Sequence, residues 1–109
     1  MPIYLKNDLI LVRYPFSNLT DSKIRPAVIV HAPHSSSDCF IVPLTSQVQM
    51  LREAEFVLNE WKAAGLNVPT AVKRGIYTIH PDLILKNIGH LLTIDAVRLE
   101  DTLRIWLGL

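Results

Sequence analysis

Two basic side chains stand where a polar segment gives way to an apolar one, in the run Lys23-Ile24-Arg25-Pro26-Ala27. A guanidinium at the mouth of a strand can hold two phosphate oxygens through paired N–H donors. The same placement suits an arginine that is solvated or ion-paired at a strand end, where it adds little to stability. Arg25 is therefore a candidate anion-binding residue, and the residues alone leave both interpretations open.

A second candidate is the run Pro43-Leu44-Thr45-Ser46-Gln47, in which an apolar segment ends in two hydroxyls and an amide. Such groups can hydrogen-bond to phosphate oxygens or to a ribose. Hydroxyl residues are also common where a turn follows a strand. This pattern predicts either a capped turn or a phosphate contact.

The remaining titratable clusters carry weaker signals. His31, His34, Asp38 and Cys39 are types that bind metals, but they lack a coordinating repeat, so we expect neither a metal nor a cofactor. His80 and His90 are isolated in the sequence, which favours structural roles over a role as general base.

A basic stretch follows the middle of the chain. Lys73 and Arg74, with Lys86 further along, belong to a segment of residues 62 to 86 that holds four basic residues and one acid. Such a segment is either a solvated face or a line of phosphate contacts.

Composition limits the class of protein to which these residues belong. The chain has 109 residues, which predicts a single domain over residues 1 to 109. Half of them are hydrophobic and 19% are charged, which excludes an intrinsically disordered chain. The net charge of +1 identifies no partner.

The sequence also indicates the cellular compartment of the protein. The single cysteine excludes an internal disulfide and a four-cysteine zinc site. No signal peptide and no apolar run of membrane-spanning length is present, so we expect a soluble cytoplasmic protein with no membrane partner.

The elements that must position the candidate side chains are short strands. Residues 9–14, 27–31 and 39–44 are rich in valine, isoleucine or phenylalanine and are separated by turn residues. Residues 55–58 predict a fourth strand, and residues 70–73 with 76–79 predict a fifth, interrupted by Gly75. The short connections favour antiparallel pairing.

Helical patterns complete the expected fold. Residues 59–65 and 82–87 predict two short helices, and a longer helix begins at Thr93, the expected cap, with Asp95 in its first turn. One apolar face of this helix would carry Ala96, Leu99, Leu103, Trp106 and Leu107, with Ile105 off that face. These elements predict an α+β fold, a small and strongly bent antiparallel β-barrel with short helical inserts and a C-terminal helix.

The order of several segments carries a family resemblance. They are Asp8-Leu9-Ile10-Leu11-Val12, Tyr14-Pro15-Phe16-Ser17-Asn18, Lys23-Ile24-Arg25-Pro26-Ala27-Val28-Ile29-Val30, Pro43-Leu44-Thr45-Ser46-Gln47, Ala64-Gly65-Leu66 and Ile88-Gly89-His90-Leu91. In this order and spacing they resemble the MazF/PemK family, in particular its PemK-like branch, the toxins of type II toxin–antitoxin pairs. The resemblance runs from about residue 8 to the C-terminus.

The resemblance implies an SH3-like barrel that forms a homodimer. It implies a metal-independent endoribonuclease that cuts single-stranded RNA and leaves a 2′,3′-cyclic phosphate and a 5′-hydroxyl. It also implies a cognate antitoxin, a flexible segment of which occupies the RNA groove. Arg25 falls on the catalytic arginine of the family and Thr45 on its catalytic threonine, with Ser46 beside it.

RNA contacts are expected from the loop before Arg25 and from the basic stretch. The candidates are Phe16, Ser17, Asn18, Lys23, Gln47, Lys73 and Arg74. Phe16 could stack on a base. We expect Lys23, Arg25, Lys73 and Arg74 to line one face, with acids such as Glu100 and Asp101 elsewhere.

The general base is unassigned. Asp21 is the carboxylate nearest to Arg25 in sequence, and His80 stands near the position at which many relatives have aspartate. Two alternatives share the same barrel. One is a non-enzymatic toxin of the gyrase-binding type, which would use an exposed Trp-Gly pair, whereas here Leu107 separates Trp106 from Gly108. The other is an inactive relative that only binds an antitoxin.

Overall fold

The computed structural model describes residues 4–14, 23–31 and 38–109. Their strands form one antiparallel sheet, in the order β4-β3-β2-β1-β6, and β5 also pairs with β3. The strands are β1 (Asp8–Tyr14), β2 (Lys23–Ile29), β3 (Cys39–Thr45), β4 (Ala71–Val72), β5 (Tyr77–Ile79) and β6 (Ile84–His90). The three strands expected at the start of the chain are therefore present, and β2 begins four residues earlier than expected.

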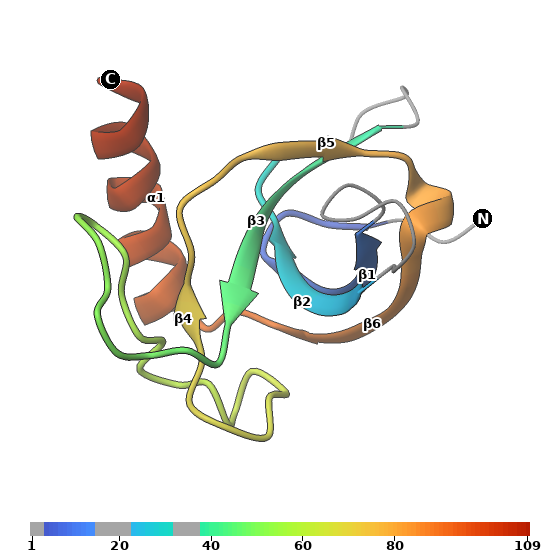
Figure 1. Cartoon of the computed structure of the whole chain (residues 1–109), viewed down its shortest axis with the longest axis horizontal. Coiled ribbons are helices and arrows are strands. Elements are labelled where there is room, and N and C mark those ends of the chain that lie inside the picture. Colours follow the sequence, from blue (N-terminus) through green and yellow to red (C-terminus); the bar gives the residue numbers. More distant parts are fainter. Residues whose placement is uncertain (1–3, 15–22, 32–37) are drawn as a thin grey trace.

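The sheet curls strongly on itself. The pairing of β1 with β6 shifts register between Leu9 and Ile10 and again between Leu11 and Val12. Such irregularities bend a strand and increase its twist. Figure 1 shows the result, an incompletely closed barrel in which the chain passes from β5 to β6 around the open side. This architecture confirms the predicted α+β barrel with a C-terminal helix.

Both faces of the central strands are buried. Leu9, Val28 and Val42 belong to a core that also includes Leu99 of the C-terminal helix. The residues that alternate with these in the same strands, such as Ile10 and Ala27, pack in a second core. Burial on both faces explains why these strands read as continuous apolar runs rather than as alternating patterns.

The C-terminal helix α1 (Thr93–Leu107) covers one side of the barrel. Leu99 is buried, and Leu103 and Trp106 pack against the same core. Leu92 occupies the cap position without a side-chain hydrogen bond, so Thr93 is the first helical residue and not the cap. Leu107 is 55% exposed and does not belong to the buried face, whereas Ile105 is exposed as expected.

Three expected elements are wrong. Residues 55–58 form only an isolated bridge, between Val57 and Ala71. Residues 59–65 form consecutive turns, in which Ala64 N–H reaches Glu60 O at 3.0 Å, and not a regular helix. Residues 82–87 contain the end of a 3₁₀ turn, η1 (Pro81–Leu83), and the start of β6. Here the pairing with β1 overrides a local helical pattern.

No helix in the described part of the chain is long and apolar enough to cross a membrane.

Candidate RNA-binding groove

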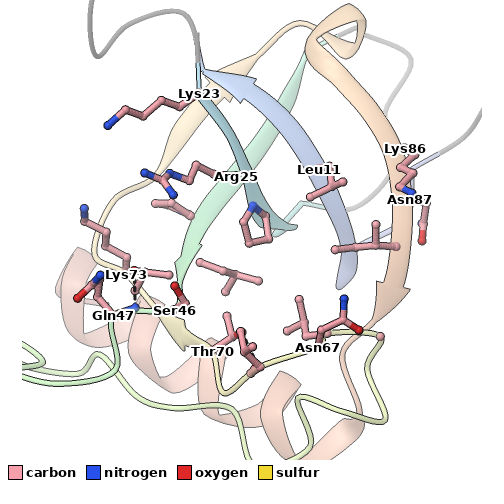
Figure 2. A pocket seen from close by; sticks show the side chains of 18 of the residues that line it. Leu11, Lys23, Arg25, Ser46, Gln47, Asn67, Thr70, Lys73, Lys86 and Asn87 are labelled. Carbon is pink, nitrogen blue, oxygen red and sulfur yellow. Dashed lines mark hydrogen bonds between the residues drawn. The ribbon is translucent and has the colours of Figure 1, made fainter. Parts of the chain in front are cut away.

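An open groove of about 930 Å³ lies where β2 begins and β3 ends (Figure 2). One wall comes from these strands and from the residues after β3 and β4, and the other comes from β1, β6 and the segment of residues 65–70. The polar lining residues are Lys23, Arg25, Thr45, Ser46, Gln47, Asn67, Thr70, Lys73, Tyr77, Lys86 and Asn87. The groove therefore brings together polar residues that are up to 64 positions apart, from Lys23 to Asn87.

Arg25 is held by the strand that carries it. Its backbone lies opposite Val12 of β1, and Pro26 lies opposite Leu11. Because a residue before proline is confined to extended conformations, Pro26 favours the strand geometry at Arg25. Lys23 and Arg25 are two residues apart in β2 and so project to the same side of the sheet. Both are exposed, and no described residue forms an ion pair with either of them.

Thr45 ends β3 and has two possible uses for its hydroxyl. Its Oγ1 accepts the backbone N–H of Gln47 at 3.0 Å, which is the turn-capping role considered for this residue. This bond uses the oxygen as an acceptor, so the hydroxyl proton can still be donated into the groove. Ser46 and Gln47, which follow, are exposed on the same wall.

Lys73 and Arg74 differ in their position relative to the groove. Lys73 N–H donates to Pro43 O at 2.9 Å, next to the end of β3, and its side chain lines the groove. Arg74 N–H instead donates to Glu55 Oε2 at 2.7 Å, and Arg74 does not line the groove. Arg74, which lies in the bend after Lys73, is not part of the described lining, and its contact with RNA stays a prediction.

The described lining of the groove is cationic. Lys23, Arg25, Lys73 and Lys86 line it, and the described lining residues include no carboxylate and no imidazole. The acids expected elsewhere lie on α1, where Glu100 pairs with Lys6 at 3.1 Å and Asp101 with Arg104 at 3.7 Å. A groove lined by cations concentrates and orients a polyanion even when the net charge of the protein is close to zero.

Phe16, Ser17, Asn18 and Asp21 lie outside the described residues, as does His34.

The described histidines have structural partners. His31 Nδ1 accepts the N–H of Phe40 at 3.3 Å, and His80 Nδ1 accepts that of Asp82 at 3.1 Å. His90 Nδ1 lies 2.8 Å from Asp8 Oδ1 at the end of the sheet. No group of three or more metal-binding side chains occurs among the residues that the structure describes.

Trp106 bears on the gyrase-type alternative. Its indole Nε1 donates to Glu53 O at 3.2 Å, and its ring packs against the core beneath α1. These contacts give the tryptophan a packing role, in contrast to the exposed Trp-Gly pair that a gyrase-binding toxin would present.

No protein-family model matches the sequence, and no curated protein matches it significantly.

Comparison of structures does find similar proteins. An endoribonuclease from Mycobacterial species has a TM-score of 0.77 at 18% identity, over 100% of this chain and 95% of that chain. An endoribonuclease in complex with its cognate antitoxin, also from Mycobacterial species, has a TM-score of 0.75 at 17% identity, over 100% and 97%. The Mycobacterium tuberculosis toxin MazF-mt6 has a TM-score of 0.73 at 20% identity, over 94% and 97%. At such low identity this similarity establishes the fold, and the chain has the fold of MazF toxins.

Proposed function

We propose that the chain is the toxin of a type II toxin–antitoxin pair and cleaves single-stranded RNA in the cationic groove. The observation that carries this proposal is the meeting of Arg25, from the start of β2, with Thr45 and Ser46, from the end of β3, in a groove whose described lining holds no acid. The MazF fold and the solved endoribonucleases that share it support the same conclusion.

The substrate supplies the nucleophile in this reaction. The ribose 2′-oxygen attacks the adjacent phosphorus and loses its proton, and the bond from phosphorus to the 5′-oxygen breaks as that oxygen takes up a proton. The products are a 2′,3′-cyclic phosphate and a 5′-hydroxyl, with no change in oxidation state. The enzyme must hold the two oxygens in line and stabilise the extra charge at phosphorus.

Arg25 is suited to this charge stabilisation. Its guanidinium has no ion-pair partner among the described residues, so it can bind two non-bridging oxygens. A guanidinium is a permanent cation in proteins, which favours charge stabilisation over a role as general acid. Thr45, whose oxygen is already engaged by Gln47 N–H, can donate a further hydrogen bond, and Ser46 lies beside it.

The remaining groove cations would contact neighbouring phosphates. Lys23 and Lys73 share the wall that carries Arg25, and Gln47 adds an amide to it. Phe16, Ser17 and Asn18 remain proposed contacts on the basis of the sequence alone.

Partners and location follow from the proposed reaction. An antitoxin would block the groove with a flexible segment, and both proteins would act in the cytoplasm, where the substrate RNA is found. The homodimer is part of the proposal, supported by exposed apolar residues of α1 such as Val97 and Ile105, which are 52% and 57% exposed. Measurement of mass in solution tests the homodimer.

RNA cleavage by purified protein in EDTA tests the function. We expect the folded protein to cut single-stranded RNA and to leave 5′-hydroxyl ends. Arg25→Ala should reduce the rate by about 10²–10³-fold or more, the value of one preorganised donor at a developing charge.

The matched control is Arg104→Ala, which removes an exposed arginine of α1 outside the groove and should keep the wild-type rate. If wild-type protein that is folded cuts no RNA, or if Arg25→Ala cuts as fast as Arg104→Ala, the proposal is wrong.

A further inference from the structure

The wall of the groove that faces Arg25 has a different chemical character. Leu11, Leu66 and Ile88 line it, and each is only partly buried, so each leaves apolar surface in the groove. In Figure 2 Lys23, Arg25 and Lys73 lie on the left of the groove, whereas Leu11 and Asn67 lie to the right. Apolar surface next to a line of cations suits an unstacked base whose phosphate is bound opposite.

Asn67 places one amide at the edge of this apolar surface. Its side chain is exposed and lines the groove, and no described residue forms a hydrogen bond with it. In Figure 2 its nitrogen is directed toward the groove. A free carboxamide offers donors and an acceptor side by side, the combination that reads the edge of a base.

The segment that carries Asn67 is held in place at both ends. A side chain at Gly89 would overlap the carbonyl oxygen of Ala64, so β6 and this segment approach as closely as two backbones can. His90 N–H donates to Ala64 O at 3.1 Å on one side. On the other, Leu58 N–H donates to Thr70 O at 2.9 Å, and Thr70 is buried. An amide presented from a rigid segment selects a partner better than one that must first be ordered.

We propose that this wall is a nucleobase subsite in which Asn67 selects the base beside the scissile phosphate. Leu11, Leu66 and Ile88 receive the face of the base, and the Asn67 amide pairs with its edge. Lys86, opposite Leu11 in the pairing of β1 with β6, adds charge on this side without reading sequence. The subsite rests on the proposed function in that it places RNA in the groove.

The test is the base preference of wild type, Asn67→Ala and Asn67→Asp on a single-stranded RNA pool with a randomised segment. Sequencing of the cleaved ends gives the preference at each position. We expect Asn67→Ala to weaken the preference at one position by roughly 5- to 150-fold, the discrimination of one bidentate amide contact. Asn67→Asp, which keeps the shape but loses the donors, should shift that position toward cytosine, because a carboxylate accepts from the cytosine amino group.

Two controls separate an amide that reads a base from a general loss of binding. Gln49→Ala removes an exposed amide outside the groove lining and should keep the wild-type preference. Lys86→Gln should weaken binding of all sequences alike and reduce its dependence on salt. An unchanged preference in both Asn67 variants overturns the subsite.

Binding measured in the Arg25→Ala background distinguishes failure of the subsite from failure of the proposed function. Four single-stranded RNAs that differ at the preferred base are titrated into Arg25→Ala protein with and without Asn67→Ala. If wild type cuts no RNA but these titrations show a base preference that Asn67→Ala removes, the enzymatic function is wrong and the subsite is correct. If the RNAs bind with equal affinity, or do not bind, the subsite is wrong.

Discussion

Asp95 is the buried carboxylate on which the attachment of α1 depends. It is fully buried, and its two oxygens accept the N–H groups of Asn59 at 2.8 Å and of Glu60 at 2.9 Å. Arg98 Nη1 lies 4.0 Å away and also donates to Asn59 Oδ1 at 2.7 Å. One side chain in the first turn of α1 therefore anchors the chain just before the turns that lead into the 65–70 wall of the groove.

The cost of Asp95→Ala can be worked from these contacts. A hydrogen bond to a charged group contributes about 1.5–3 kcal/mol, and two are lost. Because both bonds are only partly buried, water can reach the freed N–H groups, which places the loss near the lower bound, about 3 kcal/mol. For a domain of this size that loss lowers the Tm by roughly 12 °C, at about 4 °C for each kcal/mol. Asp95→Asn keeps one acceptor and should lose about half as much.

The assay is unfolding by urea and by heat, followed by circular dichroism. The matched control is Asp101→Ala, which removes a carboxylate from the same helix whose side chain is 67% exposed and whose pair with Arg104 spans 3.7 Å. An exposed pair of this kind contributes about 0–1 kcal/mol. If Asp95→Ala and Asp101→Ala lower the free energy of unfolding equally, the anchoring role of Asp95 is refuted.

Two further predictions concern packing and the lone thiol. Gly89→Ala forces apart the backbones of β6 and Ala64, so we expect a loss of about 1–3 kcal/mol in thermal unfolding, and a wild-type Tm would contradict the close approach. Burial, with a smaller effect of Asp38, raises the pKa of the Cys39 thiol. The folded protein should therefore react with iodoacetamide far more slowly than the urea-unfolded chain, and its rate should increase only at pH values above the ordinary thiol range. The stability that the neutral thiol contributes is complete below the ordinary thiol pKa and is lost as the pH rises through the folded pKa. Equal labelling of folded and unfolded protein at pH 8 would refute the burial argument.

The parts of the fold that the sequence predicts are those whose signal is local. The runs that become β1, β2 and β3 are mainly apolar, because both faces of these strands are buried over most of their length. Where the structure of a segment depends on contacts with a distant part of the chain, the sequence pattern of that segment does not predict it. Residues 84–87 carry a pattern that also suits a helix, and they become β6 only because they pair with β1. The N–H groups of residues 59 and 60 are capped by Asp95, which lies 36 and 35 positions away in the sequence.

The sequence predicts one wall of the groove better than the other, because only one of them has a local sequence signal. Arg25 and Thr45 lie at strand ends, where an apolar run meets polar residues, and that boundary can be seen in the sequence. Asn67 lies in a segment with no motif, and Lys86 lies in the strand that the sequence assigns to a helix, so only the folded chain places them opposite Arg25. If Asn67 selects the base, the wall that contains Arg25 and Thr45, which the sequence predicts, performs the cleavage. The wall that contains Asn67, which the sequence does not predict, then determines which RNA sequence is cut. Proteins of this fold could then keep the first wall and differ in the second, so that a shared cleavage reaction would not imply a shared RNA target.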